Sequence, residues 1–176
     1  MACYGFPMGV DEHRAQSSAS WGFAVLTVSD TRTERDDRGG RLVREMASSS
    51  GHREFAYAIV PDEVAEIGAK VAEFIAMTSV DVVLVTGGTG FSPRDRTLEA
   101  LAPLFDRPIE GFGELFRMLS WEQVGAAAML SRATAGVVGK RLLFLLPGSP
   151  KAVELALSKL ILPEAAHLLG QIRKVE

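Results

Sequence analysis

Three short apolar runs mark the first half of the chain. Residues 22–29 read GFAVLTVS, residues 54–60 read EFAYAIV and residues 81–86 read DVVLVT. Each run is rich in β-branched or aromatic residues, is shorter than a typical helix, and is followed by polar or small residues. The pattern predicts three strands, and the first run is typical of a strand buried on both faces.

Helical periodicity fills the intervals between these strands. Residues 42–46 carry apolar side chains at helical spacing before the small residues 48–51, and residues 61–77 carry an apolar stripe along one helical face. A further helical pattern begins at Thr97. The order β-α-β-α-β-α predicts a parallel sheet covered by helices on both sides.

The second half of the chain predicts a different edge of the sheet. Residues 105–125 are helix-rich but irregular in pattern. Residues 132–138 and 141–147 predict two short strands joined by a two-residue turn, which favours an antiparallel edge. Residues 149–169 predict a closing helix that Pro163 breaks or kinks.

Composition then narrows the class of protein. Hydrophobic residues make up 47% and charged residues 23% of 176, which predicts one globular domain over residues 21–176 after a flexible tail in residues 1–20. The net charge of −3 offers no general field for a nucleic acid. No apolar run is long enough to span a membrane. A single cysteine, Cys3, excludes an internal disulfide framework, and without a signal-peptide pattern we expect a cytoplasmic protein.

A glycine-rich motif follows the third predicted strand. Residues 84–97 read LVTGGTGFSPRDRT, with glycines at 87, 88 and 90. At the carboxyl end of a parallel strand, such residues let backbone N–H groups approach a phosphate, and a following helix adds its positive end. The spacing is neither that of a Walker A loop nor that of a dinucleotide fingerprint. Taken alone, the motif is equally compatible with a tight turn and with a phosphate cradle.

Three other loops should emerge beside this motif, because the loops that follow parallel strands share one edge of the sheet. They are the segments SDTRT, PDE and PGSPKA. Together the four loops offer the carboxylates and donors of a magnesium-nucleotide site. These residues are Asp30, Asp62 and Asp95 as carboxylates, with Ser29, Thr89, Ser149 and Lys151 as donors.

Each of these residues also has a structural alternative. Asp62 would more often simply cap the helix that follows it. Asp95 could pair with Arg94 or Arg96 in a solvated cluster, and Lys151, just inside a helix start, would usually face solvent. Their joint placement on one edge of the sheet favours a functional role over these alternatives.

Longer blocks of sequence carry a resemblance to a known family. They include VLTVSDTRT, VVLVTGGTGFSPRDRTLEAL, FDRPIEGFGELFRMLSW and AMLSRATAGVVGKRLLFLLPGSPKAVELAL. In this order they resemble the molybdenum-cofactor biosynthesis MoaB/Mog family over residues 23–169, and the G domain of gephyrin is similar. A series of long blocks is far more specific than one glycine motif.

The resemblance implies an α/β fold, a three-layer α/β/α sandwich with a mostly parallel central sheet and an antiparallel edge. It also implies a homo-oligomer, either a trimer or a dimer of trimers. The implied reaction is an adenylyl transfer, in which the terminal phosphate of molybdopterin attacks the α-phosphate of ATP and pyrophosphate leaves. Because two phosphate groups repel each other, we expect magnesium to assist this reaction. The product would pass to the molybdate-inserting protein of the pathway.

The resemblance also assigns site residues. The family's catalytic positions match Asp62, Asp95 and Ser120, and the two carboxylates are the candidate magnesium ligands. The implied phosphate- and pterin-binding residues are Ser29, Asp30, Gly87, Gly88, Thr89, Gly90, Pro147, Gly148, Ser149 and Lys151. Beside them, the segment GFGE at residues 111–114 offers Glu114 as a further polar contact.

Two functional hypotheses from different classes follow. The leading one is an enzyme, a molybdopterin adenylyltransferase. The second is a non-catalytic molybdopterin-binding or scaffold protein of the same pathway, because the block at residues 105–121 is closer to the MoaB branch than to the Mog branch. A generic nucleotide-binding α/β protein ranks below both.

Overall fold

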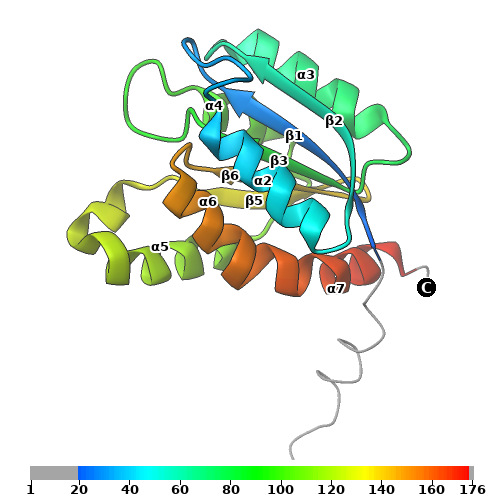
Figure 1. The fold of residues 1–176 in the computed structure, drawn as a ribbon. Helices are drawn as coiled ribbons and strands as arrows, with labels where there is room; N and C mark the ends of the chain where they lie inside the picture. The colour runs from blue at the N-terminus through cyan, green and yellow to red at the C-terminus, as the bar shows by residue number, and fades with distance from the viewer. Residues whose placement is uncertain (1–19, 175–176) are drawn as a thin grey trace, which may run out of the picture.

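A computed structural model describes residues 20–174, so the predicted tail, apart from Ser20, lies outside the described residues. In this range six strands form one mixed sheet, in the order β2-β1-β3-β6-β5-β4 (Figure 1). Strands β2, β1, β3 and β6 run parallel, whereas β5 and β4 are antiparallel to their neighbours. The strands are β1 (Gly22–Val28), β2 (Arg53–Val60), β3 (Val82–Thr86), β4 (Arg107–Pro108), β5 (Thr134–Val138) and β6 (Arg141–Leu146).

Helices cover both faces of this sheet. Figure 1 shows α3 on one side and α2, α5, α6 and α7 on the other, which confirms the predicted three layers. The α-helices are α2 (Arg38–Ser49), α3 (Val64–Ala76), α4 (Thr97–Leu101), α5 (Glu110–Val124), α6 (Pro150–Ala156) and α7 (Leu162–Arg173). Shorter turns are the 3₁₀ segments η1 (Ala102–Leu104) and η2 (Gly125–Leu130) and the π-helical segment η3 (Leu157–Ile161).

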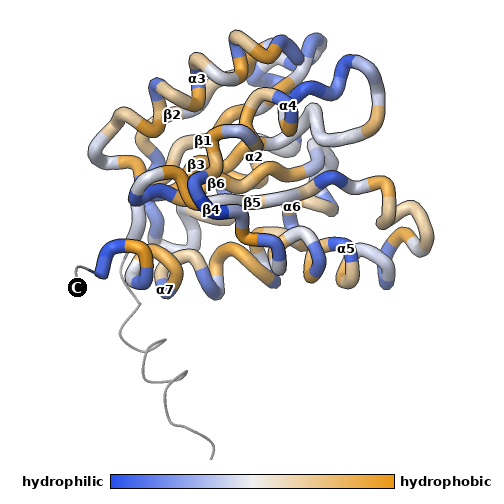
Figure 2. Tube along the Cα trace, turned by 180° about the vertical axis from the view of Figure 1, so that it is seen from behind, coloured by the Kyte–Doolittle hydropathy of each residue, from blue (hydrophilic) through white to orange (hydrophobic). Residues whose placement is uncertain are grey.

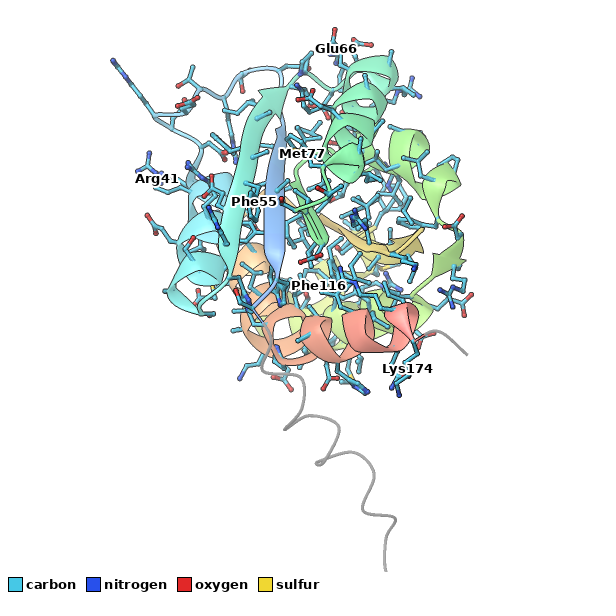
Figure 3. The ribbon with its side chains drawn as sticks, turned by 90° about the vertical axis from the view of Figure 1, so that its right-hand side faces the viewer. Arg41, Phe55, Glu66, Met77, Phe116 and Lys174 are labelled. Carbon is cyan, nitrogen blue, oxygen red and sulfur yellow. The ribbon has the colours of Figure 1, made fainter. Side chains whose placement is uncertain are left out.

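Alternation along the central strands supplies two hydrophobic cores. In β1, Phe23 and Val25 pack toward α2, α5, α6 and α7, whereas Ala24 and Leu26 pack toward α3 and α4. Phe116 of α5 belongs to the first core and lies among the side chains beneath the sheet (Figure 3). Because both faces are covered, the central strands are apolar throughout, which is why the sequence shows them as continuous runs.

The structure differs from the sequence-based prediction in three local features. The helix that begins at Thr97 has only five residues, so it supplies no strong positive end to the glycine motif. Residues 105–125 include the short edge strand β4, which the irregular pattern concealed. The predicted helix with a break or kink at Pro163 is not broken there: α7 runs through Pro163 to Arg173, and the π-helical segment η3 ends two residues before the proline.

The predicted hairpin at the edge of the sheet is confirmed. Val138 of β5 pairs with Arg141 of β6 across a two-residue turn, and Gly139 in that turn has φ +58°. Along residues 20–174 the structure contains no helix with both the length and the apolar character needed to cross a bilayer.

Candidate functional site

A pocket of about 530 Å³ lies where the loops after β1, β2, β3 and β6 meet. This is the carboxyl edge of the parallel strands, where ligands of open α/β sheets bind. The structure therefore brings together residues from all four loops named by the sequence. Ten of the predicted site residues line the pocket: Ser29, Asp62, Gly87, Gly88, Thr89, Gly90, Asp95, Pro147, Gly148 and Ser149.

The glycine motif forms a sharp turn at the end of β3. Gly87 and Gly88 have φ of +100° and +61°, a region that favours glycine. Thr97 fixes the turn from the far end of the loop: its hydroxyl donates to the Gly87 carbonyl at 2.8 Å, and its N–H donates to the Gly88 carbonyl at 3.0 Å. The loop therefore holds itself in a sharp turn through its own hydrogen bonds, as the tight-turn interpretation of the motif predicts.

The same turn leaves backbone donors for a ligand. The Gly87 N–H donates to the Leu146 carbonyl at 3.0 Å, so it belongs to the sheet and is not available to a phosphate. The N–H groups of Gly88, Thr89 and Gly90 make no hydrogen bond within residues 20–174. Three amides of the predicted cradle, those of Gly88, Thr89 and Gly90, are thus free to bind an anion, whereas the Gly87 amide is not.

Asp62 does not cap the helix after β2, contrary to the structural alternative for this residue. The N-cap of α3 is Glu63, without a side-chain hydrogen bond, and the Asp62 N–H instead donates to Oδ1 of Asp30 at 3.1 Å. Oδ1 of Asp62 is buried and has no hydrogen-bond partner in the described part of the chain. Burial raises the pKa of Asp62, and the nearby Asp30 and Asp95 carboxylates raise it further.

The carboxylate of Asp95 is held by its own loop, whereas the Asp95 main-chain carbonyl accepts a hydrogen bond from Nη2 of Arg132 at 3.2 Å. Oδ2 of Asp95 accepts a hydrogen bond from the Ser92 N–H at 2.8 Å, and the carboxylate forms no ion pair among residues 20–174. Arg94 turns the other way and pairs with Asp30 at 2.8 Å and Glu63 at 3.0 Å. The predicted alternative of an Asp95–Arg94 pair is therefore wrong, and the Asp95 carboxylate stays available to the pocket.

Four predicted site residues do not line this pocket. Asp30 is occupied by Arg94 and by the Asp62 N–H, and the Arg94 guanidinium lowers the pKa of this carboxyl group. Ser120 is buried within α5. Glu114 lines a separate hollow beside α5, and Lys151 lines another between α5 and α6. Their predicted catalytic or binding roles stay predictions.

Two polar residues of the pocket were missed by the sequence reasoning. Ser131, just after η2, lines the pocket, and its hydroxyl accepts a 3.3 Å hydrogen bond from the Ala133 N–H. Arg32, in the loop after β1, also lines it. Ser131 lies in the quoted block AMLSRATAG and Arg32 in the segment SDTRT, so position in these segments was the signal that could have identified them.

The donor set fits a magnesium ion in part. Within residues 20–174 no group of three or more His, Cys, Asp or Glu side chains gathers in metal-binding geometry. Two carboxylates nevertheless face one pocket, and the buried Oδ1 of Asp62 lacks any partner. Magnesium binds through one or two carboxylates and completes its shell with water and substrate phosphates, so this sparse set is compatible with it.

Comparison with known proteins places the chain in a family. The family described as "Probable molybdopterin binding domain" matches residues 24–167. The protein named Molybdenum cofactor biosynthesis protein B of Bacillus subtilis is 46% identical over 168 residues, which cover 95% of this chain and 99% of the relative. The chain belongs to the MoaB family of molybdopterin-binding domains.

Solved structures of MoaB proteins share the fold. A crystal structure of a Molybdenum cofactor biosynthesis protein B is 45% identical, covers 88% of this chain and 97% of its own, and gives a TM-score of 0.86. The tungsten cofactor synthesizing protein MoaB from Pyrococcus furiosus is 42% identical, with coverage of 88% and 98% and a TM-score of 0.81. The predicted family and fold class are both confirmed.

Proposed function

We propose that this MoaB protein binds molybdopterin and ATP in the pocket at the carboxyl edge and transfers AMP to the terminal phosphate of the pterin. In this reaction a phosphate oxygen of molybdopterin forms a bond to the α-phosphorus of ATP. The bond between the α-phosphorus and the bridging oxygen breaks, and pyrophosphate leaves with that oxygen. Membership of the MoaB family supports the pterin as substrate.

The observation that carries the proposal is the buried, unpartnered Oδ1 of Asp62 in the same pocket as Asp95. A carboxylate oxygen without a donor is unfavourable in the interior unless a cation or a proton completes it. Magnesium held by Asp62 and Asp95 would supply neutralisation of the phosphate charges. Two repelling phosphate substrates need such charge neutralisation before they can approach in line.

The free N–H groups of Gly88, Thr89 and Gly90 support the same reaction. They point to a preorganised set of backbone donors for one phosphate group. No side-chain base is needed, because a phosphate monoester with a second pKa near 6 is mostly ionised at pH 7. The hydroxyl of Ser131 is a further polar contact for a ligand in this pocket.

A second candidate function is molybdopterin binding without transfer. It is favoured by the commitment of Asp30 to Arg94, which leaves two pocket carboxylates where three were predicted. The experiment that separates the two candidates incubates the purified chain with ATP, magnesium and molybdopterin and quantifies pyrophosphate and adenylated pterin. Adenylated product supports the enzyme, whereas binding of molybdopterin without any product would support the second candidate.

The proposal includes a homo-oligomer, a trimer or a dimer of trimers, that hands its product to the molybdate-inserting protein. Figure 2 shows hydrophobic residues along α5, and several apolar side chains of α5 and η2 are exposed, which supports a subunit interface. Met118 is 60% and Trp121 62% exposed, which is unusual for side chains of this size on a monomer.

A further inference from the structure

Phosphate substrates require positive charge that the predicted site residues do not supply. The pocket contains the carboxylates of Asp62 and Asp95, whereas the predicted cation, Lys151, lines a different hollow. Arg94 is engaged by Asp30 and Glu63 and does not line the pocket. Among the residues that the structure describes, Arg32 is the positively charged side chain that lines this pocket.

The Arg32 guanidinium is held in place by two elements. Its Nη1 donates to the Gly148 carbonyl at 3.3 Å and to Oδ1 of Asp37 at 3.4 Å. It is also closely packed against α2: a Cβ on Gly39 would lie 3.4 Å from Nη1 and 2.9 Å from the Gly148 oxygen. Arg32 is therefore positioned by the start of α2 on one side and by the loop after β6 on the other.

Asp37 does not need Arg32 for its own hydrogen bonds. This carboxylate is fully buried, and its Oδ2 accepts from the hydroxyl groups of Thr27 at 2.5 Å and Tyr57 at 2.8 Å. Its Oδ1 caps α2 by accepting from the Gly40 N–H at 2.9 Å. The 3.4 Å contact from Asp37 therefore orients the Arg32 guanidinium through one nitrogen, Nη1, whereas a purely structural salt bridge would be expected to engage more of the guanidinium.

Most of the donor capacity of Arg32 thus remains unused. Its Nε and Nη2 make no hydrogen bond within residues 20–174, and its side chain is 34% exposed. A guanidinium carries five N–H donors in a planar fork that matches the oxygen atoms of a phosphate group. The position and the free donors both suit an anion in the pocket.

We propose that Arg32 binds a phosphate group of the ligand through its free Nε and Nη2 donors, with Asp37 and the Gly148 carbonyl holding the guanidinium toward the pocket. The proposal rests on the proposed function only in that it takes phosphate-bearing substrates as the ligands. Asp62 lies against Gly88, whereas Arg32 lies against Gly39 of α2 and Gly148. The glycine turn therefore lies between the Asp62 carboxylate, which suits a cation, and the Arg32 guanidinium, which suits a phosphate.

The test is isothermal titration of the full chain with two probes, inorganic pyrophosphate and molybdopterin. Arg32→Met should weaken the binding of at least one probe by about 10-fold to 100-fold, because it removes a charge-assisted pair of hydrogen bonds. Arg32→Lys, which keeps the charge and loses the fork, should give an intermediate loss. Arg35→Met removes the same charge from an exposed position of the same loop, outside the pocket lining, and should leave both affinities unchanged.

The two probes identify which phosphate Arg32 holds. A loss confined to pyrophosphate assigns Arg32 to the nucleotide, and a loss confined to molybdopterin assigns it to the pterin phosphate. Unchanged affinity for both probes in Arg32→Met, or no binding of either by the wild-type chain, would overturn the proposal. We expect the Arg32 variants to fold, because Asp37 keeps its other three hydrogen-bond donors. Thermal unfolding of each variant checks this. These binding results do not depend on whether AMP is transferred, so the proposed reaction can fail while this inference stands.

Discussion

Gly88 lies directly against the buried carboxylate of Asp62, so that a Cβ on Gly88 would sit 2.5 Å from Asp62 Oδ1. The glycine therefore does two things: it adopts a φ of +61° in the turn after β3, and it leaves room for the carboxylate beside it.

Gly88→Ala should destabilise the protein and displace Asp62. The left-handed conformation alone costs a non-glycine residue about 1–3 kcal/mol, and close contacts of the added Cβ with Thr97 Oγ1 and, at 2.5 Å, with Asp62 Oδ1 add to that cost. Urea unfolding measures the loss. The matched control is Gly139→Ala, because Gly139 has a similar φ of +58° with nothing within 4 Å of the added Cβ. Equal losses in the two variants would show that the close packing of Gly88 against Thr97 and Asp62 does not matter.

Asp62→Asn should increase stability at neutral pH. The pKa of Asp62 is raised by burial and then by Asp30 and Asp95, so this carboxyl group binds a proton more tightly in the folded state than in the unfolded chain. Ionised Asp62 therefore lowers the free energy of unfolding above the ordinary pKa of 3.8, and this penalty diminishes as the pH falls. The variant should exceed the wild type in denaturant midpoint at pH 7, with the difference narrowing toward acid pH.

Asp36→Asn is the control of opposite sign. Hydrogen bonds from the Thr33 N–H and hydroxyl lower the pKa of this exposed carboxyl group, so its ionised form contributes stability that is lost as the pH falls through its folded pKa. The Asp36→Asn variant should therefore be less stable than the wild type at pH 7. If Asp62→Asn were less stable than the wild type at pH 7, Asp62 would not be an unpaired buried charge.

The exposed apolar surface on α5 and η2 should be a subunit interface. Replacing Trp121 or Met118 with glutamate should convert the oligomer to smaller species in sedimentation velocity at micromolar concentration, because burying a charge in an apolar interface is unfavourable. Phe91→Glu, at an exposed apolar side chain outside this surface, should leave the assembly intact. A wild-type chain that sediments as a monomer would contradict the interface. The apolar residues of this surface on α5 and η2 are Leu115, Met118, Trp121, Val124, Met129 and Leu130.

The strands and the edge that carries the pocket were predictable because their signals are local. Buried parallel strands are continuous apolar runs, and parallel topology brings the loops after them to one edge whatever their separation in sequence. Asp62, Asp95 and the glycine turn therefore came together as expected. The short strand β4 was not predictable, since two residues carry no periodicity.

Side-chain partners were less predictable, because they depend on contacts between loops. Arg94 pairs with Asp30, which lies 64 residues away in the sequence, and not with the adjacent Asp95. Sequence adjacency had favoured Asp95 as the partner. Ser120 is buried on α5 and does not line the pocket, whereas Ser131, in the segment after η2, does. Neither orientation can be inferred from residue type alone.

In the proposed reaction, Asp62 and Asp95 serve adenylyl transfer in this pocket. The most direct test measures adenylated molybdopterin formed at saturating ATP and magnesium by Asp62→Asn and Asp95→Asn, beside the wild type and the exposed control Asp36→Asn, with molybdopterin affinity measured in parallel. We expect each site variant to lose at least about 100-fold in turnover with pterin affinity largely retained, since the lost charge acts mainly in the transition state. Near-normal turnover in both site variants would mean that these two carboxylates do not take part in the transfer.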